Sequence, residues 1–75
     1  MISYNNLWHI MLDKNIKKGQ LCELTGISSS TMAKLSKNEM VSLDVLEKIC
    51  IALDCNLGDV AEFDYGQGER QNEEV

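Results

Sequence analysis

Residues 18–37 read KGQLCELTGISSSTMAKLSK, and this pattern predicts two short helices joined by a tight turn. The buried side of the first helix is expected to comprise Leu21, Cys22, Leu24 and Thr25. Gly26 then interrupts the pattern, because only glycine adopts a positive φ angle without a steric cost. The Ser28 hydroxyl can cap the second helix, which we expect to run from about Ser29 to Ser36. The chain should therefore change direction sharply at Gly26.

Helical periodicity extends over the rest of the chain. Proline is absent and apolar residues repeat at intervals of three and four, so we expect helices throughout. A first helix is indicated by the stripe of Tyr4, Leu7, Trp8 and Met11. The most regular stripe predicts a fourth helix with Leu46, Ile49, Cys50 and Leu53 on its buried side. A last short helix should reach Val60 and Ala61, and Phe63 is expected to close the core.

The ends of these helices also leave signals in the sequence. Asn15 and Asp54 can take the left-handed conformation that ends a helix. Ser42 can cap the fourth helix, and Asn56 can cap the last one, with Asp59 as its capping-box partner. We therefore predict an all-α fold, a compact five-helix domain over residues 1–65. The acidic tail at residues 66–75 has almost nothing apolar to bury, so we expect it to be disordered.

Length and hydropathy limit the class of protein. A chain of 75 residues has room for one small hydrophobic core. The longest uninterrupted apolar run, Ile49 to Leu53, is far shorter than the roughly 20 residues of a membrane-spanning helix. No secretory signal follows Met1. We therefore expect a cytoplasmic protein with no membrane partner.

The cysteines and the histidine do not predict a catalytic or metal site. Cys22, Cys50 and Cys55 lie within apolar patterns, which favours reduced core thiols over a disulfide framework. A zinc site is the alternative, but it would need His9 together with all three cysteines, and no C-x2-C pair is present. His9 also lacks a nucleophile or an orienting acid at a plausible position. We expect no enzyme activity, no metal, no cofactor and no small-molecule ligand.

Charge is distributed unevenly along the chain, whose formal net charge is −5. Residues 1–41 carry five lysines against three acids, whereas residues 42–75 carry two basic residues against nine acids. The local field, more than the net charge, steers a charged partner. The basic half can therefore face an anionic partner, although an ordinary solvated surface would show the same charges.

The second helix of the 18–37 stretch offers one polar, basic face. Its helical periodicity places Ser29, Ser30, Ala33, Lys34 and Lys37 together, and places Met32 and Leu35 on the opposite side. A helix with small hydroxyls and lysines on its outer face suits the major groove of DNA, which admits a helix. The serines can reach base edges, and the lysines can bind guanine edges or phosphates. Lys17 and Lys18 can clamp the backbone at the start of the preceding helix.

As a set, these residues resemble the lambda repressor and Cro family of helix-turn-helix DNA-binding proteins. The resemblance covers about residues 4–63 and rests on a run from Leu21 to Ser28 followed by further matching positions in the next two helices. Those later positions are Thr31, Met32, Leu35, Ser42, Leu43, Leu46, Ile49 and Leu53. The resemblance implies a five-helix domain, a recognition helix in the major groove and a transcriptional regulator that acts as a dimer on a two-fold operator.

The predicted DNA-binding residues combine the exposed face with the positions that the resemblance implies. They are Lys17, Lys18, Ser28, Ser29, Ser30, Ala33, Lys34, Lys37 and Asn38. Three features depart from the family pattern. Lys17 stands where a Ser or Thr cap is usual, so the helix from Lys18 is expected to fray at its start. Lys18 replaces the usual glutamine, so its phosphate contact should be more electrostatic and less fixed in geometry. The serines lack the bidentate reach of Asn, Gln or Arg, so discrimination between sequences should be modest.

Two classes of function follow from these patterns. The first is a sequence-specific DNA-binding regulator, a repressor, bound as a homodimer to a double-stranded operator, because one recognition helix reads few base pairs. The alternative is a protein-interaction module on the same fold, such as an antirepressor or an antitoxin, in which the acidic half contacts another protein.

Overall fold

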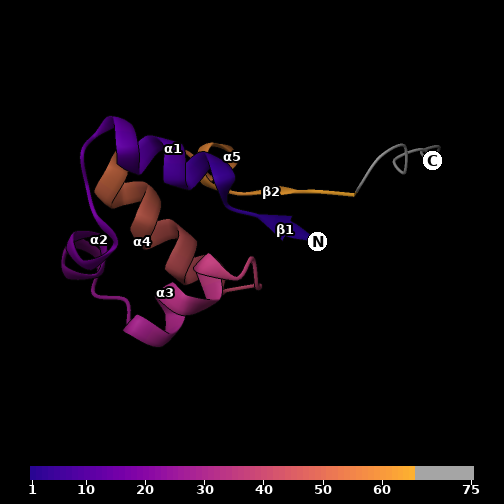
Figure 1. The fold of residues 1–75 in the computed structure, drawn as a ribbon, viewed down its shortest axis with the longest axis horizontal. Helices are drawn as coiled ribbons and strands as arrows, with labels where there is room; N and C mark the ends of the chain where they lie inside the picture. Colours follow the sequence, from indigo (N-terminus) through magenta and orange to yellow (C-terminus); the bar gives the residue numbers. More distant parts are fainter. Residues whose placement is uncertain (66–75) are drawn as a thin grey trace.

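The helix α4 (Leu43–Leu53) lies at the centre of the fold, with the other helices around it, in a computed structural model that describes residues 1–65 (Figure 1). The surrounding helices are α1 (Asn5–Asp13), α2 (Lys18–Thr25), α3 (Ser29–Ser36) and α5 (Leu57–Val60). These five helices confirm the predicted five-helix architecture. The predicted disordered tail at residues 66–75 lies outside the described residues.

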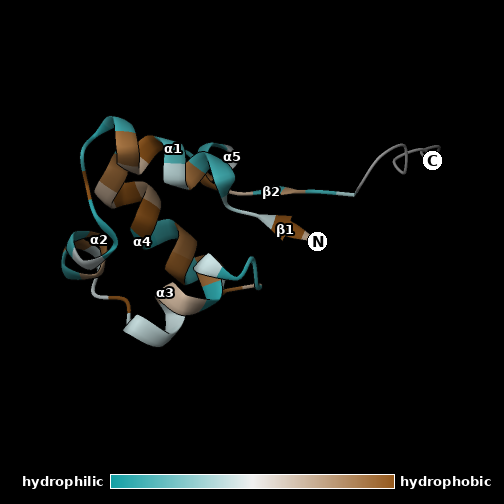
Figure 2. Ribbon diagram, in the orientation of Figure 1, coloured by the Kyte–Doolittle hydropathy of each residue, from teal (hydrophilic) through white to brown (hydrophobic). Residues whose placement is uncertain are grey.

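The core forms along the apolar stripe of α4, which is the most hydrophobic ribbon at the centre of Figure 2. Leu46, Ile49 and Leu53 are buried, as their spacing predicts. The other helices contribute buried apolar side chains to the same cluster. These are Leu7 and Met11 of α1, Leu21 of α2, Met32 and Leu35 of α3 and Val60 of α5. One continuous core thus fixes the position of α3 relative to the rest of the chain.

Three helices end in the same way, with a non-glycine residue in the left-handed region. Asn15, Asn38 and Asp54 have φ angles of 57°, 56° and 55°. In each case the next residue's N–H donates to a carbonyl five residues earlier: Ile16 to Met11 at 2.8 Å, Glu39 to Lys34 at 2.9 Å and Cys55 to Cys50 at 3.0 Å. This is the Schellman pattern. The left-handed conformations predicted for Asn15 and Asp54 are confirmed, and Asn38 adds a third.

A short two-stranded sheet joins the two ends of the domain, which the helical periodicity did not predict. The strands β1 (Ile2–Ser3) and β2 (Glu62–Phe63) run antiparallel, with Ile2 opposite Phe63. The Met1 ammonium group donates to the Asp64 carbonyl oxygen at 3.1 Å. Strands of two residues are too short to show the alternation that identifies a strand in sequence.

Two side chains expected in the core lie largely outside it. Phe63 is 57% exposed, because β2 extends beyond the helices and no element of residues 1–65 covers that edge (Figure 1). Leu24 is 59% exposed, since α2 is short and fully buries only Leu21 against the core. The predictions for Phe63 and Leu24 were therefore wrong.

Candidate nucleic-acid interface

The turn between α2 and α3 depends on Gly26. This residue has a φ angle of 78°, and its N–H donates to the Cys22 carbonyl oxygen at 2.8 Å. Ile27, directly after it, is buried in the core and anchors the turn. The Ile27 N–H donates to the Thr25 hydroxyl oxygen at 3.3 Å. The predicted change of direction at Gly26 is confirmed.

The first turn of α3 is capped by Ser28, as predicted. The Ser28 hydroxyl oxygen accepts a hydrogen bond from the Thr31 N–H at 3.1 Å. The same hydroxyl lies 3.0 Å from that of Ser30, so both belong to one hydroxyl cluster at the helix start. The Ser29 hydroxyl makes no hydrogen bond within residues 1–65. Ser29 therefore has its full hydrogen-bonding capacity available to a ligand.

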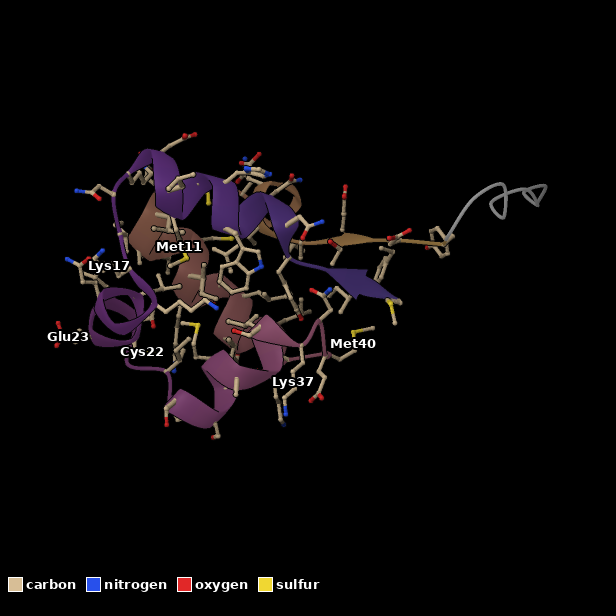
Figure 3. All side chains as sticks on the ribbon, in the orientation of Figure 1. Met11, Lys17, Cys22, Glu23, Lys37 and Met40 are labelled. Atoms are coloured by element: carbon tan, nitrogen blue, oxygen red, sulfur yellow. The ribbon has the colours of Figure 1, made fainter. Side chains whose placement is uncertain are left out.

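The two sides of α3 differ as its sequence predicts. Met32 and Leu35 are buried, at 7% and 0% exposure. The outer face is solvent-exposed along its whole length and consists of Ser29, Ser30, Ala33, Lys34 and Lys37. Figure 2 shows the first turn of α3 as a pale ribbon, of intermediate hydropathy, on the outside of the molecule, and in Figure 3 Lys37 extends outward from the end of the helix. A partner can therefore approach this face directly.

Lys18 is held in place by two neutral groups. Its ammonium nitrogen donates to the Ser36 hydroxyl oxygen at 2.9 Å and lies 4.7 Å from the centre of the Trp8 ring. Trp8, expected in the core, is half-buried, and its exposed ring face receives the lysine. An ammonium group has three donors, so Lys18 retains hydrogen-bonding capacity for an anion.

The lysines around α2 and α3 carry uncompensated charge. Among residues 1–65, no carboxylate lies within ion-pair distance of these side chains. The four lysines are Lys17, Lys18, Lys34 and Lys37, and all are exposed. Figure 3 shows Lys17 at the start of α2 and Lys37 beyond the end of α3, so positive charge flanks the pair of helices. Such a surface attracts polyanions.

The start of α2 is capped by Gln20, a role that was not predicted from the sequence. The Lys17 N–H donates to the Gln20 side-chain oxygen at 2.9 Å, which is half of a capping box. The Lys17 N–H therefore has a hydrogen-bond acceptor at the start of α2, where the helix was expected to fray. The signal was present in the sequence, because Gln20 stands three residues after the cap position.

Asn38, one of the predicted DNA-binding residues, also has a structural contact. Its side-chain oxygen accepts from the Tyr4 N–H at 3.4 Å, and the Tyr4 hydroxyl donates to the Glu39 carbonyl oxygen at 2.7 Å. Tyr4 is fully buried, and this burial raises the pKa of its hydroxyl. The end of α3 is thus attached to the N-terminal segment, an interaction between residues far apart in sequence.

Residues 1–65 contain neither a cluster of metal ligands nor a membrane-spanning helix. No group of three or more His, Cys, Asp or Glu side chains in that part of the chain is placed to hold a metal ion. The helices there are also too short or too polar to cross a membrane.

Comparison with known proteins agrees with this geometry. The family model of the Cro/C1-type helix-turn-helix DNA-binding domain matches residues 6–65. The crystal structure of the transcriptional regulator VanUg is 54% identical in sequence and has a TM-score of 0.79, with 81% of each chain covered. No curated protein matches the sequence. The family match spans most of the chain and includes α2, the turn and α3, so this chain belongs to the Cro/C1-type helix-turn-helix DNA-binding family.

Proposed function

We propose that this chain is a sequence-specific transcriptional regulator that inserts α3 into the major groove of an operator. The observation that carries the proposal is the exposed face of α3, which is polar and basic while Met32 and Leu35 hold the opposite side in the core. Membership of a DNA-binding family and the likeness to VanUg, a transcriptional regulator, support the same function.

The residues of the exposed face have separate roles in this proposal. Ser29, with its free hydroxyl, and Ser30 contact base edges. Lys34 and Lys37 bind guanine edges or the adjacent phosphates, and Ala33 allows the helix a close approach. Lys17 and Lys18 bind backbone phosphates at the start of α2, where the helix N-terminus also favours an anion. Ser28 and Asn38 shape the two ends of α3.

The regulator is proposed to act as a homodimeric repressor. One recognition helix contacts few base pairs, so useful specificity requires two copies on a two-fold site. Repression requires only that the protein occupy its site. Exposed apolar side chains supply surface for pairing: Leu43 at the start of α4, Leu57 of α5 and Phe63 of β2 border one groove of about 290 Å³. A mass measurement in solution tests the dimer.

Substitution of Lys34 tests the DNA site. Duplexes are first selected from a random-sequence pool with the wild-type chain, and the affinity of Lys34→Ala for the selected duplex is then measured. We expect a loss of about tenfold, because one base or phosphate contact is removed from the α3 face. The thermal melting temperature should stay near that of the wild type, since the Lys34 side chain is exposed.

Lys48→Ala is the matched control. It removes the same charge from an exposed position on α4, outside the proposed site. Its affinity for the selected duplex should remain close to the wild-type value. Equal affinities for Lys34→Ala and Lys48→Ala would show that Lys34 does not contact DNA. If the wild-type chain enriched no duplex, the proposed function itself would be contradicted.

A further inference from the structure

Two thiols meet where α4 ends. Asp54 takes the left-handed conformation there, and the chain turns back so that the Cys55 N–H donates to the Cys50 carbonyl oxygen at 3.0 Å. In this type of helix end, the side chains at these two positions are frequently in contact. The backbone bond between the two residues and the groove that both side chains line place the two thiols next to each other. The structure therefore contains a pair of adjacent free thiols.

The pair is accessible from solvent. Both cysteines are only partly buried, and both line a groove of about 340 Å³ beside the start of α5. The groove wall is largely apolar, with Leu43, Leu46 and Leu57 contributing to it. Burial, Cys50 and Asp59 together raise the pKa of the Cys55 thiol, with burial the largest cause. Because the thiolate is the nucleophile, Cys55 should react second.

We propose that Cys50 and Cys55 form a redox-active dithiol that a low-molecular-weight disulfide converts to an intramolecular disulfide bond. The Cys50 thiolate attacks one sulfur of the small disulfide, forming a mixed disulfide and releasing one small thiolate. Cys55 then loses its proton to solvent and attacks the Cys50 sulfur, which releases the second small thiolate. The protein loses two electrons and two protons, and the small disulfide is reduced to two thiols.

The new bond would fasten the last turn of α4 to the segment that leads into α5. It would close a ring around Asp54, whose left-handed conformation already brings Cys50 and Cys55 together. The exposed face of α3 is formed by a different part of the chain. We therefore expect the exposed face of α3 to keep its conformation in the oxidised protein, and the inference does not depend on the proposed DNA-binding function.

Oxidation of the full chain tests the proposal. The protein is incubated with oxidised glutathione, free thiols are alkylated, and the products are analysed by non-reducing mass spectrometry and peptide mapping. We expect no covalent bond between chains, the loss of two hydrogen atoms per chain, a bond between Cys50 and Cys55, and a single alkylated thiol at Cys22. The Cys22→Ser variant should form the same bond, which serves as the matched control.

Substituting one cysteine of the pair at a time tests whether Cys50 and Cys55 react with each other or only separately with glutathione. In Cys55→Ser, Cys50 should accumulate as a stable mixed disulfide with glutathione, because the second thiol is missing. Cys50→Ser should lose the intramolecular bond without a change in fold, as judged by circular dichroism. Three results with the wild type would overturn the proposal. These are three alkylated thiols after oxidation, a disulfide bond that includes Cys22, and glutathione adducts without an intramolecular bond.

Discussion

Tyr4 shows how one residue links distant parts of this small domain. Its ring is fully buried, and its hydroxyl donates to the Glu39 carbonyl oxygen at 2.7 Å, just after α3. A buried hydroxyl without a partner is unfavourable, so this contact favours one position for the end of α3. From the sequence, Tyr4 was predicted to belong to the apolar stripe of the first helix. Its hydroxyl contact could not be predicted, because Glu39 is 35 residues away.

Replacing Tyr4 with phenylalanine tests the contact. Tyr4→Phe keeps the ring and removes the hydroxyl, so the free energy of unfolding should fall by about 1 kcal/mol. Urea denaturation monitored by circular dichroism measures the change. Glu39→Ala is the control, since it keeps the backbone carbonyl and should stay near wild-type stability. A Tyr4→Phe variant as stable as the wild type would show that the hydroxyl contributes nothing.

At the scale of elements, most of the fold could be predicted from local signals. The predicted bounds of α3, Ser29 to Ser36, agree with the structure, because a serine cap and an apolar pair define that helix locally. The α4 stripe likewise predicted three buried residues correctly. Phe63 and Leu24 were predicted wrongly, because burial depends on which element covers a side chain and not on its hydropathy alone. The DNA-binding assignments of individual residues stay predictions.

The turn between α2 and α3 permits a test with two glycines. Gly26→Ala should destabilise the domain by about 1 kcal/mol, because a Cβ is unfavourable at a φ angle of 78° even though no atom lies within 4 Å of its position. Gly19→Ala makes the same chemical change inside α2, also in open space, and should stabilise the domain by up to about 1 kcal/mol. Thermal melts of both variants measure the two effects. Shifts of the same sign would contradict the role assigned to Gly26.

At the scale of the whole molecule, the two ends of the domain are joined by contacts that no local pattern encodes. The Asp64 N–H donates to the Met1 carbonyl oxygen at 2.6 Å, and the Met1 ammonium donates to the Asp64 carbonyl oxygen. Each strand contributes only two residues, so the pairing forms because the helices have already brought the segments together. The helices could be predicted from the sequence, but the pairing of β1 with β2 could not.

The distribution of charge over the whole molecule predicts how DNA binding depends on salt. If Lys17, Lys18, Lys34 and Lys37 each contact one phosphate, a plot of log K against log salt should have a slope of about −3.6 for one protomer and about twice that for a dimer. Fluorescence anisotropy with a selected duplex at several salt concentrations measures the slope. In Lys34→Ala, the magnitude of the slope per protomer should fall by about 0.9 if Lys34 binds a phosphate. The slope should not change if Lys34 binds only a base edge. A slope near zero would contradict phosphate binding by this surface. Each phosphate contact releases a condensed cation and therefore contributes to the salt dependence, whatever the net charge of the chain.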